Sequence, residues 1–276
     1  MRTAQDAELD FVSLRPRYVE RDGVAIEYSV SGEGAPLLLV FGFGMSQEDW
    51  AALGYVGLLA RHFQAIAVSP RGHGRSSKPH EASDYSLAAI AGDLVAVLDA
   101  LAVPRAVVWG YSLGAKFALA LAAQAPERVA GLVLGGFETA SEVNLEDDIV
   151  THTLRRGGAA WRELWDRMAA FPAPMLARLE ACDTAALLAL REAEAGWGSF
   201  ESIVDGLRVS GLLYAAEHCF ARQSVVAASR RIAGARYLER AAADHFSLIP
   251  DAGWIVDEVV ATFGSSARPK PLDPSR

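Results

Sequence analysis

The chain has 276 residues, 51% of them hydrophobic and 22% charged, so it can bury a large core and is not intrinsically disordered. Its 34 acidic residues outnumber the 26 basic ones, and a formal net charge of -8 argues against nucleic acid or an anionic membrane as a partner. Two cysteines are too few for a disulfide framework. Acidic residues near the N-terminus interrupt the apolar stretch that a signal peptide would need. No window of the sequence reaches the roughly 18–20 apolar residues of a membrane-spanning helix. We therefore expect a cytoplasmic protein, a monomer or a homodimer, that acts on a small molecule.

The first half of the chain alternates between strand-like and helix-like segments. Residues 18–30 predict a β-hairpin around Asp22-Gly23, a strong two-residue turn signal. Continuous apolar runs predict buried strands, and amphipathic runs predict helices. The strands are expected at residues 37–41, 64–68, 106–109 and 129–134, and the helices at 51–62, 87–101 and 115–125. This order predicts a parallel sheet with helices on both faces.

The alternation stops at residues 138–209, which contain no convincing strand. Trp161, Leu164, Trp165 and Met168 follow helical spacing, so we expect a helical cap here. Strands at 211–215 and 236–239 and helices at 220–232 and 255–263 then resume the pattern. We predict an α/β fold with a mostly parallel twisted sheet of about eight strands, flanked by helices. Its core comprises residues 15–137 and 210–264, its cap residues 138–209, and its extended or disordered tails residues 1–14 and 265–276.

The pentapeptide Gly110-Tyr111-Ser112-Leu113-Gly114 follows a predicted strand and opens a predicted helix. A G-x-S-x-G sequence in that context is typical of a nucleophile elbow, in which the central residue takes a strained backbone conformation. The small flanking residues allow two chain segments to approach closely. Ser112 is therefore the candidate nucleophile at the sheet edge, with a helix N-terminus beneath it.

A serine hydroxyl needs a base to remove its proton. His245 is the candidate because it follows the last predicted strand and precedes the last predicted helix. In a parallel sheet that position brings the histidine loop beside the serine loop. We therefore predict that Ser112 and His245 act together.

The elbow, the late histidine, the strand order and the helical insert together resemble the α/β-hydrolase superfamily over roughly residues 19–263. Two further motifs fit this resemblance. Phe41-Gly42-Phe43-Gly44 is similar to the family's oxyanion loop, although phenylalanine replaces the usual histidine. Residues 69–76 resemble the loop Asp-x-Arg-Gly-x-Gly-x-Ser, with serine in place of the aspartate. The resemblance implies a cofactor-free and metal-free site whose oxyanion hole consists of the Phe43 and Leu113 backbone N–H groups.

The third member of the triad departs from the family pattern. The resemblance places an aspartate after the strand at 211–215, where this chain reads Ala216-Glu217-His218-Cys219, so that Cys219 holds the place of the acid. Three interpretations stay open. Glu138, at the end of the preceding strand, serves as the acid; Glu217 serves after a local shift; or no acid exists and the catalyst is weakened or diverted. Asp244 is discounted because it adjoins the histidine that it would have to orient.

The leading hypothesis is a carboxylic ester hydrolase that cleaves an ester, lactone or thioester of a moderately sized apolar molecule through an acyl-enzyme. Its predicted catalytic residues are Ser112, His245 and Glu138, with Glu217 as the alternative acid. The expected pocket residues are Gly42, Tyr111, Phe137, Trp165 and Phe246. The alternative is a diverged lyase or cyclase, or a ligand-binding protein with weak hydrolysis, because Cys219 stands at the acid position.

Overall fold

The computed structural model describes residues 14–140 and 143–264. The predicted tails therefore lie outside the described residues, apart from Leu14. Among the described residues, one sheet runs in the spatial order β1-β2-β4-β3-β5-β6-β7-β8. Its strands are β1 Arg17–Arg21, β2 Val24–Ser31, β3 Ala35–Val40, β4 Phe63–Ser69, β5 Ala106–Tyr111, β6 Val129–Gly135, β7 Gly211–Ala216 and β8 Arg236–Arg240. Strands β1 and β2 form an antiparallel hairpin, β2 also pairs antiparallel with β4, and the remaining pairs are parallel.

Helices fill the connections between these strands. They are α1 Gln47–Ala52, α2 Tyr55–Leu59, α3 Leu87–Ala100, α4 Leu113–Gln124, α5 Ile149–Arg155, α6 Gly158–Met168, α7 Ala173–Glu180, α8 Thr184–Gly196, α9 Glu201–Gly206, α10 Arg222–Arg231 and α11 Ala252–Phe263. Helix α3 packs on α4, α4 on α9 and α9 on α10, whereas α11 packs on α2. These helices bury the continuous apolar strands, as the sequence pattern predicts. No helix in residues 14–140 or 143–264 combines the length and the apolar character needed to cross a membrane.

The predicted fold class is confirmed, with one local correction. The hairpin turns at Asp22 and Gly23, whose φ values of 52° and 78° suit a tight two-residue turn. The single helix expected at residues 51–62 is wrong. Gly54 has a φ of 85°, which ends α1 and separates it from α2.

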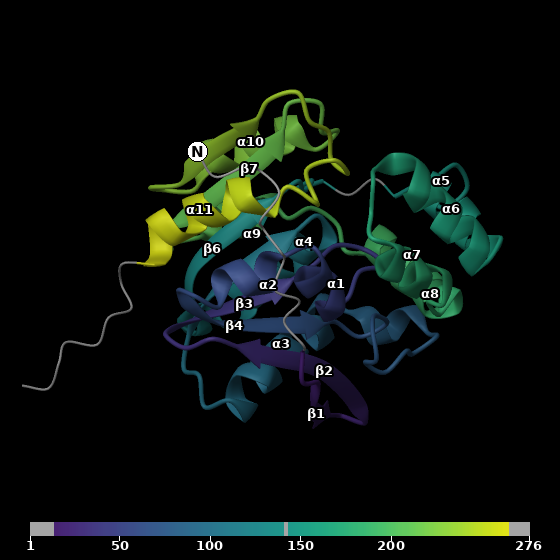
Figure 1. Ribbon diagram of the computed structural model, residues 1–276, viewed down its shortest axis with the longest axis horizontal. Coiled ribbons are helices and arrows are strands. Elements are labelled where there is room, and N and C mark those ends of the chain that lie inside the picture. Colours follow the sequence, from purple (N-terminus) through teal and green to yellow (C-terminus); the bar gives the residue numbers. More distant parts are fainter. Residues whose placement is uncertain (1–13, 141–142, 265–276) are drawn as a thin grey trace, which may run out of the picture.

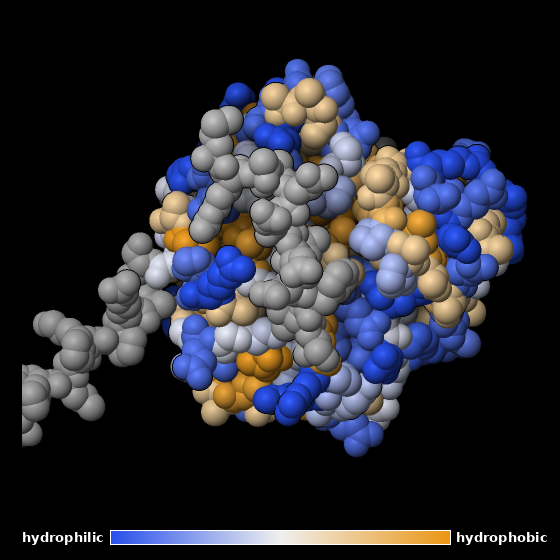
Figure 2. Space-filling model, in the orientation of Figure 1, coloured by the Kyte–Doolittle hydropathy of each residue, from blue (hydrophilic) through white to orange (hydrophobic). Residues whose placement is uncertain are grey.

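The segment between β6 and β7, here called the insert (residues 136–210), contains helices α5 to α9. Figure 1 shows α5 to α8 gathered at one side of the molecule, away from the hairpin β1–β2. Hydrophilic residues cover much of the visible outer side of α5 and α6 in Figure 2. Because β3, β5, β6, β7 and β8 are parallel, their carboxyl ends lie at one edge of the sheet. The loops that follow these strands carry the candidate catalytic residues.

Candidate active site

Ser112 occupies a sharp turn between β5 and α4. Its φ of 55° and ψ of -119° are unusual for a residue with a side chain. The flanking glycines explain how the turn fits. A Cβ on Gly110 would lie 2.2 Å from the Gly114 carbonyl oxygen, and a Cβ on Gly114 would lie 2.1 Å from the Val40 carbonyl oxygen. Side chains at either position would therefore collide with backbone, and the pentapeptide forms the strand–turn–helix arrangement that its sequence predicts.

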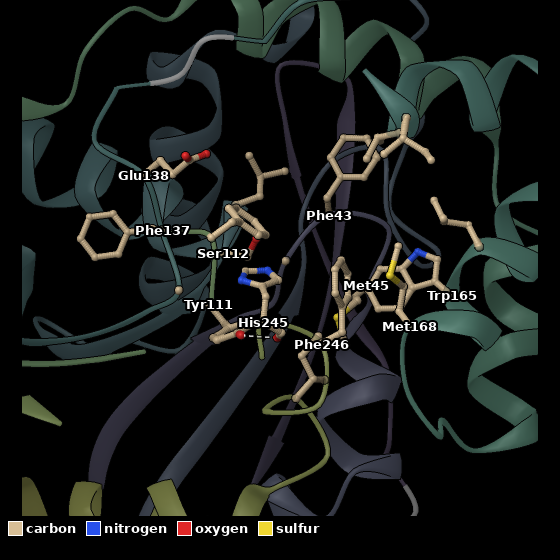
Figure 3. Close-up of a pocket in the computed structure, with 18 of the residues that line it drawn as sticks. Phe43, Met45, Tyr111, Ser112, Phe137, Glu138, Trp165, Met168, His245 and Phe246 are labelled. Atoms are coloured by element: carbon tan, nitrogen blue, oxygen red, sulfur yellow. Dashed lines mark hydrogen bonds between the residues drawn. The ribbon is translucent and has the colours of Figure 1, made fainter. Parts of the chain in front are cut away.

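Ser112 lies on the wall of a cavity of about 390 Å³ between the sheet edge and the insert. Apolar and aromatic side chains make up most of this wall, which suits a compact organic ligand. The residues that line it are Gly42, Phe43, Met45, Tyr111, Ser112, Leu113, Lys116, Gly136, Phe137, Glu138, Asp148, Ile149, Val150, Trp161, Leu164, Trp165, Met168, Arg191, Glu194, Phe220, His245, Phe246 and Ile249. Every predicted pocket residue is among them. Figure 3 shows the His245 ring beside the Ser112 side chain, opposite Trp165 and Met168.

His245 follows β8 and is 5% exposed. The Tyr111 hydroxyl donates a hydrogen bond of 2.6 Å to the His245 carbonyl oxygen, which fixes the loop against the elbow. The His245 ring packs among the rings of Tyr111, Phe220 and Phe246, with centroid distances of 5.1, 4.5 and 5.1 Å. Burial lowers the pKa of His245 to about 4, and the nearby Asp244 charge opposes this shift. The ring is therefore a neutral base at neutral pH.

Cys219 lies at the Nδ1 side of the His245 ring. Its Sγ is 3.2 Å from Nδ1, and its side chain is buried. Two backbone hydrogen bonds between the loops after β7 and β8 create this contact: Glu217 N–H donates to the Arg240 carbonyl oxygen, and His218 N–H donates to the Ala243 carbonyl oxygen, both at 2.9 Å. The register of the sequence motif thus places sulfur where a carboxylate is expected.

The two glutamates predicted as the acid have different positions. The structure does not bring Glu217 to His245, because its Oε2 accepts a hydrogen bond of 2.8 Å from the Ala242 N–H in an exposed turn. Glu138 does lie on the cavity wall, but the residue is exposed, and Figure 3 shows its carboxylate apart from the imidazole. Within the described ranges, His245 has no hydrogen bond to either carboxylate. The catalytic role of Glu138 stays a prediction.

Asp244 is held within its own turn. Its Oδ1 accepts hydrogen bonds from the Phe246 N–H at 2.9 Å and the Ser247 N–H at 2.8 Å. These bonds to Ser247 and Phe246 lower the pKa of Asp244. The carboxylate therefore stabilises the turn that presents His245, in agreement with the sequence argument that set Asp244 aside.

The two predicted oxyanion donors belong to different segments of the chain, the start of α4 and the loop after β3. Leu113 is the first residue of α4, where backbone N–H groups have no acceptor within the helix. Phe43 lies on the cavity wall in the loop after β3. The adjacent Gly42 is so close to the elbow that a Cβ on it would be 3.1 Å from Ser112 Cβ. This arrangement places two backbone segments beside any acyl group attached to Ser112.

Sequence reasoning missed a charged part of the cavity wall. Lys116 Nζ is 2.7 Å from Glu194 Oε1, Arg191 Nη1 is 2.5 Å from Glu194 Oε2, and Arg191 Nη2 is 3.0 Å from Asp148 Oδ1. Lys116 belongs to α4, whereas its charged neighbours belong to the insert. One signal was available: Lys116 stands in the Ala/Leu-rich helix one turn after Ser112, where a buried ammonium group requires a partner. Its partner depends on how the insert packs, which the sequence pattern does not predict.

The described ranges contain no group of three or more His, Cys, Asp or Glu residues that could hold a metal ion. Residues 35–219 match the family described as "alpha/beta hydrolase fold". The chain belongs to this family.

Solved structures resemble the chain over most of its length. A hydrolase from Pseudomonas aeruginosa is 25% identical with a TM-score of 0.80, covering 91% of this chain and 98% of that one. The enol-lactonase from Burkholderia xenovorans is 26% identical with a TM-score of 0.74, covering 89% of this chain and 98% of that one.

Curated relatives match over shorter stretches. The pimeloyl-[acyl-carrier protein] methyl ester esterase of Methylococcus capsulatus is 41% identical over 113 residues, which is 41% of this chain and 40% of the relative. The matches span between 30% and 41% of the curated relatives' own lengths.

Proposed function

We propose that this protein is a cofactor-free serine hydrolase that cleaves an acyl compound through an ester of Ser112. One observation carries the proposal: a serine in the strained elbow conformation and a buried, neutral histidine lie on the wall of the same cavity. Such a pair combines a nucleophile with a base. The named activities of the enol-lactonase and the methyl ester esterase support hydrolysis at an acyl carbon.

In the proposed reaction, Ser112 Oγ forms a bond with the acyl carbon while its proton passes to Nε2 of His245. The Phe43 and Leu113 N–H groups stabilise the tetrahedral oxyanion. The bond to the leaving group then breaks, and the proton on Nε2 passes to the leaving group or to solvent, which returns His245 to its neutral form. Water next attacks the Ser112 ester, and His245 accepts a proton from that water. The C–O bond to Ser112 breaks, the proton returns to Oγ, and the free acid leaves.

The proposed substrate is a compact acyl compound with an apolar body. Trp161, Trp165, Leu164 and Met168 of α6 face the cavity and would contact that body. Ile149 and Phe220 also line it, although they are 61% and 63% exposed, so they belong to its solvent-facing rim. As part of this proposal the protein acts in the cytoplasm, which the two unpaired cysteines, Cys182 and Cys219, support.

The test is the intact mass after prolonged treatment with a fluorophosphonate. We expect one adduct on the wild-type protein and none on the folded Ser112→Ala variant. Glu138→Gln and Glu217→Gln are treated in parallel, and slower labelling of one of them would identify that residue as the acid. A folded wild-type protein that takes up no label would contradict the nucleophile. The Cys219 contact would then favour the second candidate, a diverged lyase or a protein that binds an apolar ligand.

A further inference from the structure

We propose that Cys219 positions His245 in place of a carboxylate and thereby confines the enzyme to activated acyl substrates: aryl and enol esters, enol lactones and thioesters. The inference rests on the proposed serine hydrolase and names its substrate class. It starts from the contact of 3.2 Å between Cys219 Sγ and His245 Nδ1.

The surroundings of Nδ1 leave the sulfur as its polar neighbour. A Cβ added to Gly136 would lie 3.1 Å from Nδ1, so the chain after β6 passes directly against this side of the ring. Asp244 is bound to the N–H groups of its own turn, and Glu217 is bound to the Ala242 N–H. Glu138 is exposed, and its carboxylate lies apart from the ring in Figure 3. No carboxylate in the described ranges is therefore hydrogen-bonded to the imidazole.

The contact determines which nitrogen of His245 carries the proton during catalysis. If Nε2 is to accept the proton of Ser112, then Nδ1 must be protonated, and its N–H donates to Cys219 Sγ. Burial, together with the negative charges of Glu138 and Asp244, raises the pKa of Cys219 to about 11, so the acceptor is a neutral thiol. The thiol orients the ring, but it supplies no negative charge.

The missing charge has a chemical consequence. An imidazolium forms when Ser112 transfers its proton, and in a Ser-His-Asp triad the carboxylate both holds the correct tautomer and stabilises that cation. Replacing it by an amide, which favours the wrong tautomer, lowers kcat by about 10⁴-fold. The neutral thiol beside His245 gives no such stabilisation, and the nearby Asp244 charge offsets the effect of burial only in part. Substrates with electrophilic carbonyls and stable leaving anions depend less on it, because a phenolate, enolate or thiolate departs without first taking a proton. The proton on Nε2 then passes to water.

The experiment compares kcat/KM for p-nitrophenyl acetate, phenyl acetate and ethyl acetate, which share one acyl group and differ in the leaving group. We expect wild-type kcat/KM to fall steeply along this series. The variant Cys219→Asp places a carboxylate at Nδ1, and we expect it to raise kcat/KM for ethyl acetate by about 10-fold or more, and for p-nitrophenyl acetate by less. In Cys219→Asp, kcat/KM should therefore depend less on the leaving group than it does in the wild type.

Two control variants distinguish an effect of Cys219 on the His245 ring from a general effect of the substitution on the fold. Cys182→Asp introduces a carboxylate at the other cysteine, which is half-buried and outside the cavity. It should leave kcat/KM for all three acetate esters unchanged. Cys219→Ser keeps a polar neighbour for Nδ1 and should keep the steep dependence. NMR titration of the His245 Hε1 proton gives a readout that packing alone would not move: we expect its pKa to rise in Cys219→Asp and to stay low in Cys182→Asp.

A shallow leaving-group dependence in the wild type, with ethyl acetate nearly as reactive as p-nitrophenyl acetate, would overturn the inference. So would a Glu138→Gln variant that loses all activity while Cys219→Ala keeps it, because a distant carboxylate would then be the acid. If Cys219→Asp does not fold, the wild-type and Cys219→Ser series decide the question. Failure of the underlying function looks different: Ser112→Ala would then hydrolyse the esters no more slowly than the wild type, and the fluorophosphonate would not react.

Discussion

Lys116 Nζ lies 2.7 Å from Glu194 Oε1, and both side chains are at most 7% exposed. This ion pair joins α4, one turn after Ser112, to α8 of the insert. Glu194 also accepts from Arg191, so a single carboxylate lies between two cations. The network fixes the position of the insert relative to the elbow.

Replacing this carboxylate should destabilise the protein. We expect Glu194→Gln to lower the free energy of unfolding by about 3 kcal/mol, because two largely buried cations lose their shared anion. Urea denaturation followed by circular dichroism measures the change. Glu192→Gln, at an exposed position of the same helix, is the matched control and should change stability by less than about 0.5 kcal/mol. Equal stability of the two variants would show that the ion pair contributes nothing.

The proposed base gives the pH profile an unusual acidic limb. Burial lowers the pKa of His245 to about 4 from 6.5, so the imidazole is unprotonated over most of the acidic range. Asp244 raises this pKa, while Cys219 and Tyr111, the other titratable groups against the ring, are neutral there. We expect kcat/KM for p-nitrophenyl acetate to stay constant down to about pH 5 and to fall as the pH passes through about 4. A limb near the ordinary histidine pKa would contradict the structure.

The pH dependence of stability should involve His73 as well. Burial lowers the pKa of His73 to about 4 from 6.5, against the effect of its contact with the Arg71 carbonyl oxygen. Between these two values the unfolded chain binds a proton that the folded protein does not, so stability decreases as the pH falls through this window. Urea unfolding at several pH values gives the change of the free energy of unfolding with pH. In this window we expect that slope to be smaller in His73→Gln than in the wild type by about 1 kcal/mol per pH unit. His62→Gln, at an exposed histidine, should keep the wild-type slope.

Gly42 should matter for reactivity more than for folding. A Cβ at this position would be 3.1 Å from Ser112 Cβ and 3.7 Å from Ser112 Oγ, so the Gly42→Ala variant must displace the nucleophile or the oxyanion loop. We expect fluorophosphonate labelling to slow by about 10- to 100-fold, because small displacements of reacting groups are costly. Gly253→Ala, whose added Cβ would meet nothing within 4 Å, is the control. An unchanged labelling rate in Gly42→Ala would show that the loop can move without slowing the reaction of Ser112.

The features that sequence predicted correctly depend on local patterns. Apolar runs revealed the strands, and Asp22-Gly23 revealed the hairpin. The break between α1 and α2 was missed because helical spacing continues across Gly54, whose positive φ ends the first helix. The register after β7 placed Cys219 at the acid position, and the loops after β7 and β8 bring its sulfur to Nδ1. Residue spacing did not determine whether Glu138 or Glu217 also reaches the ring, because that depends on how these loops meet. The partners of Lys116 depend on the packing of α8, which no local pattern encodes.

The insert leaves the sheet after β6 and returns at β7, and these strands are neighbours, with Gly135 paired to Tyr214. Its two ends therefore meet without passing through Ser112 or His245, which are carried by the loops after β5 and β8. During evolution such a segment can lengthen, shorten or be exchanged while the reacting groups keep their places. Selection for a new substrate can then act on α5 to α8 alone, provided that the new helices still supply a carboxylate to Lys116.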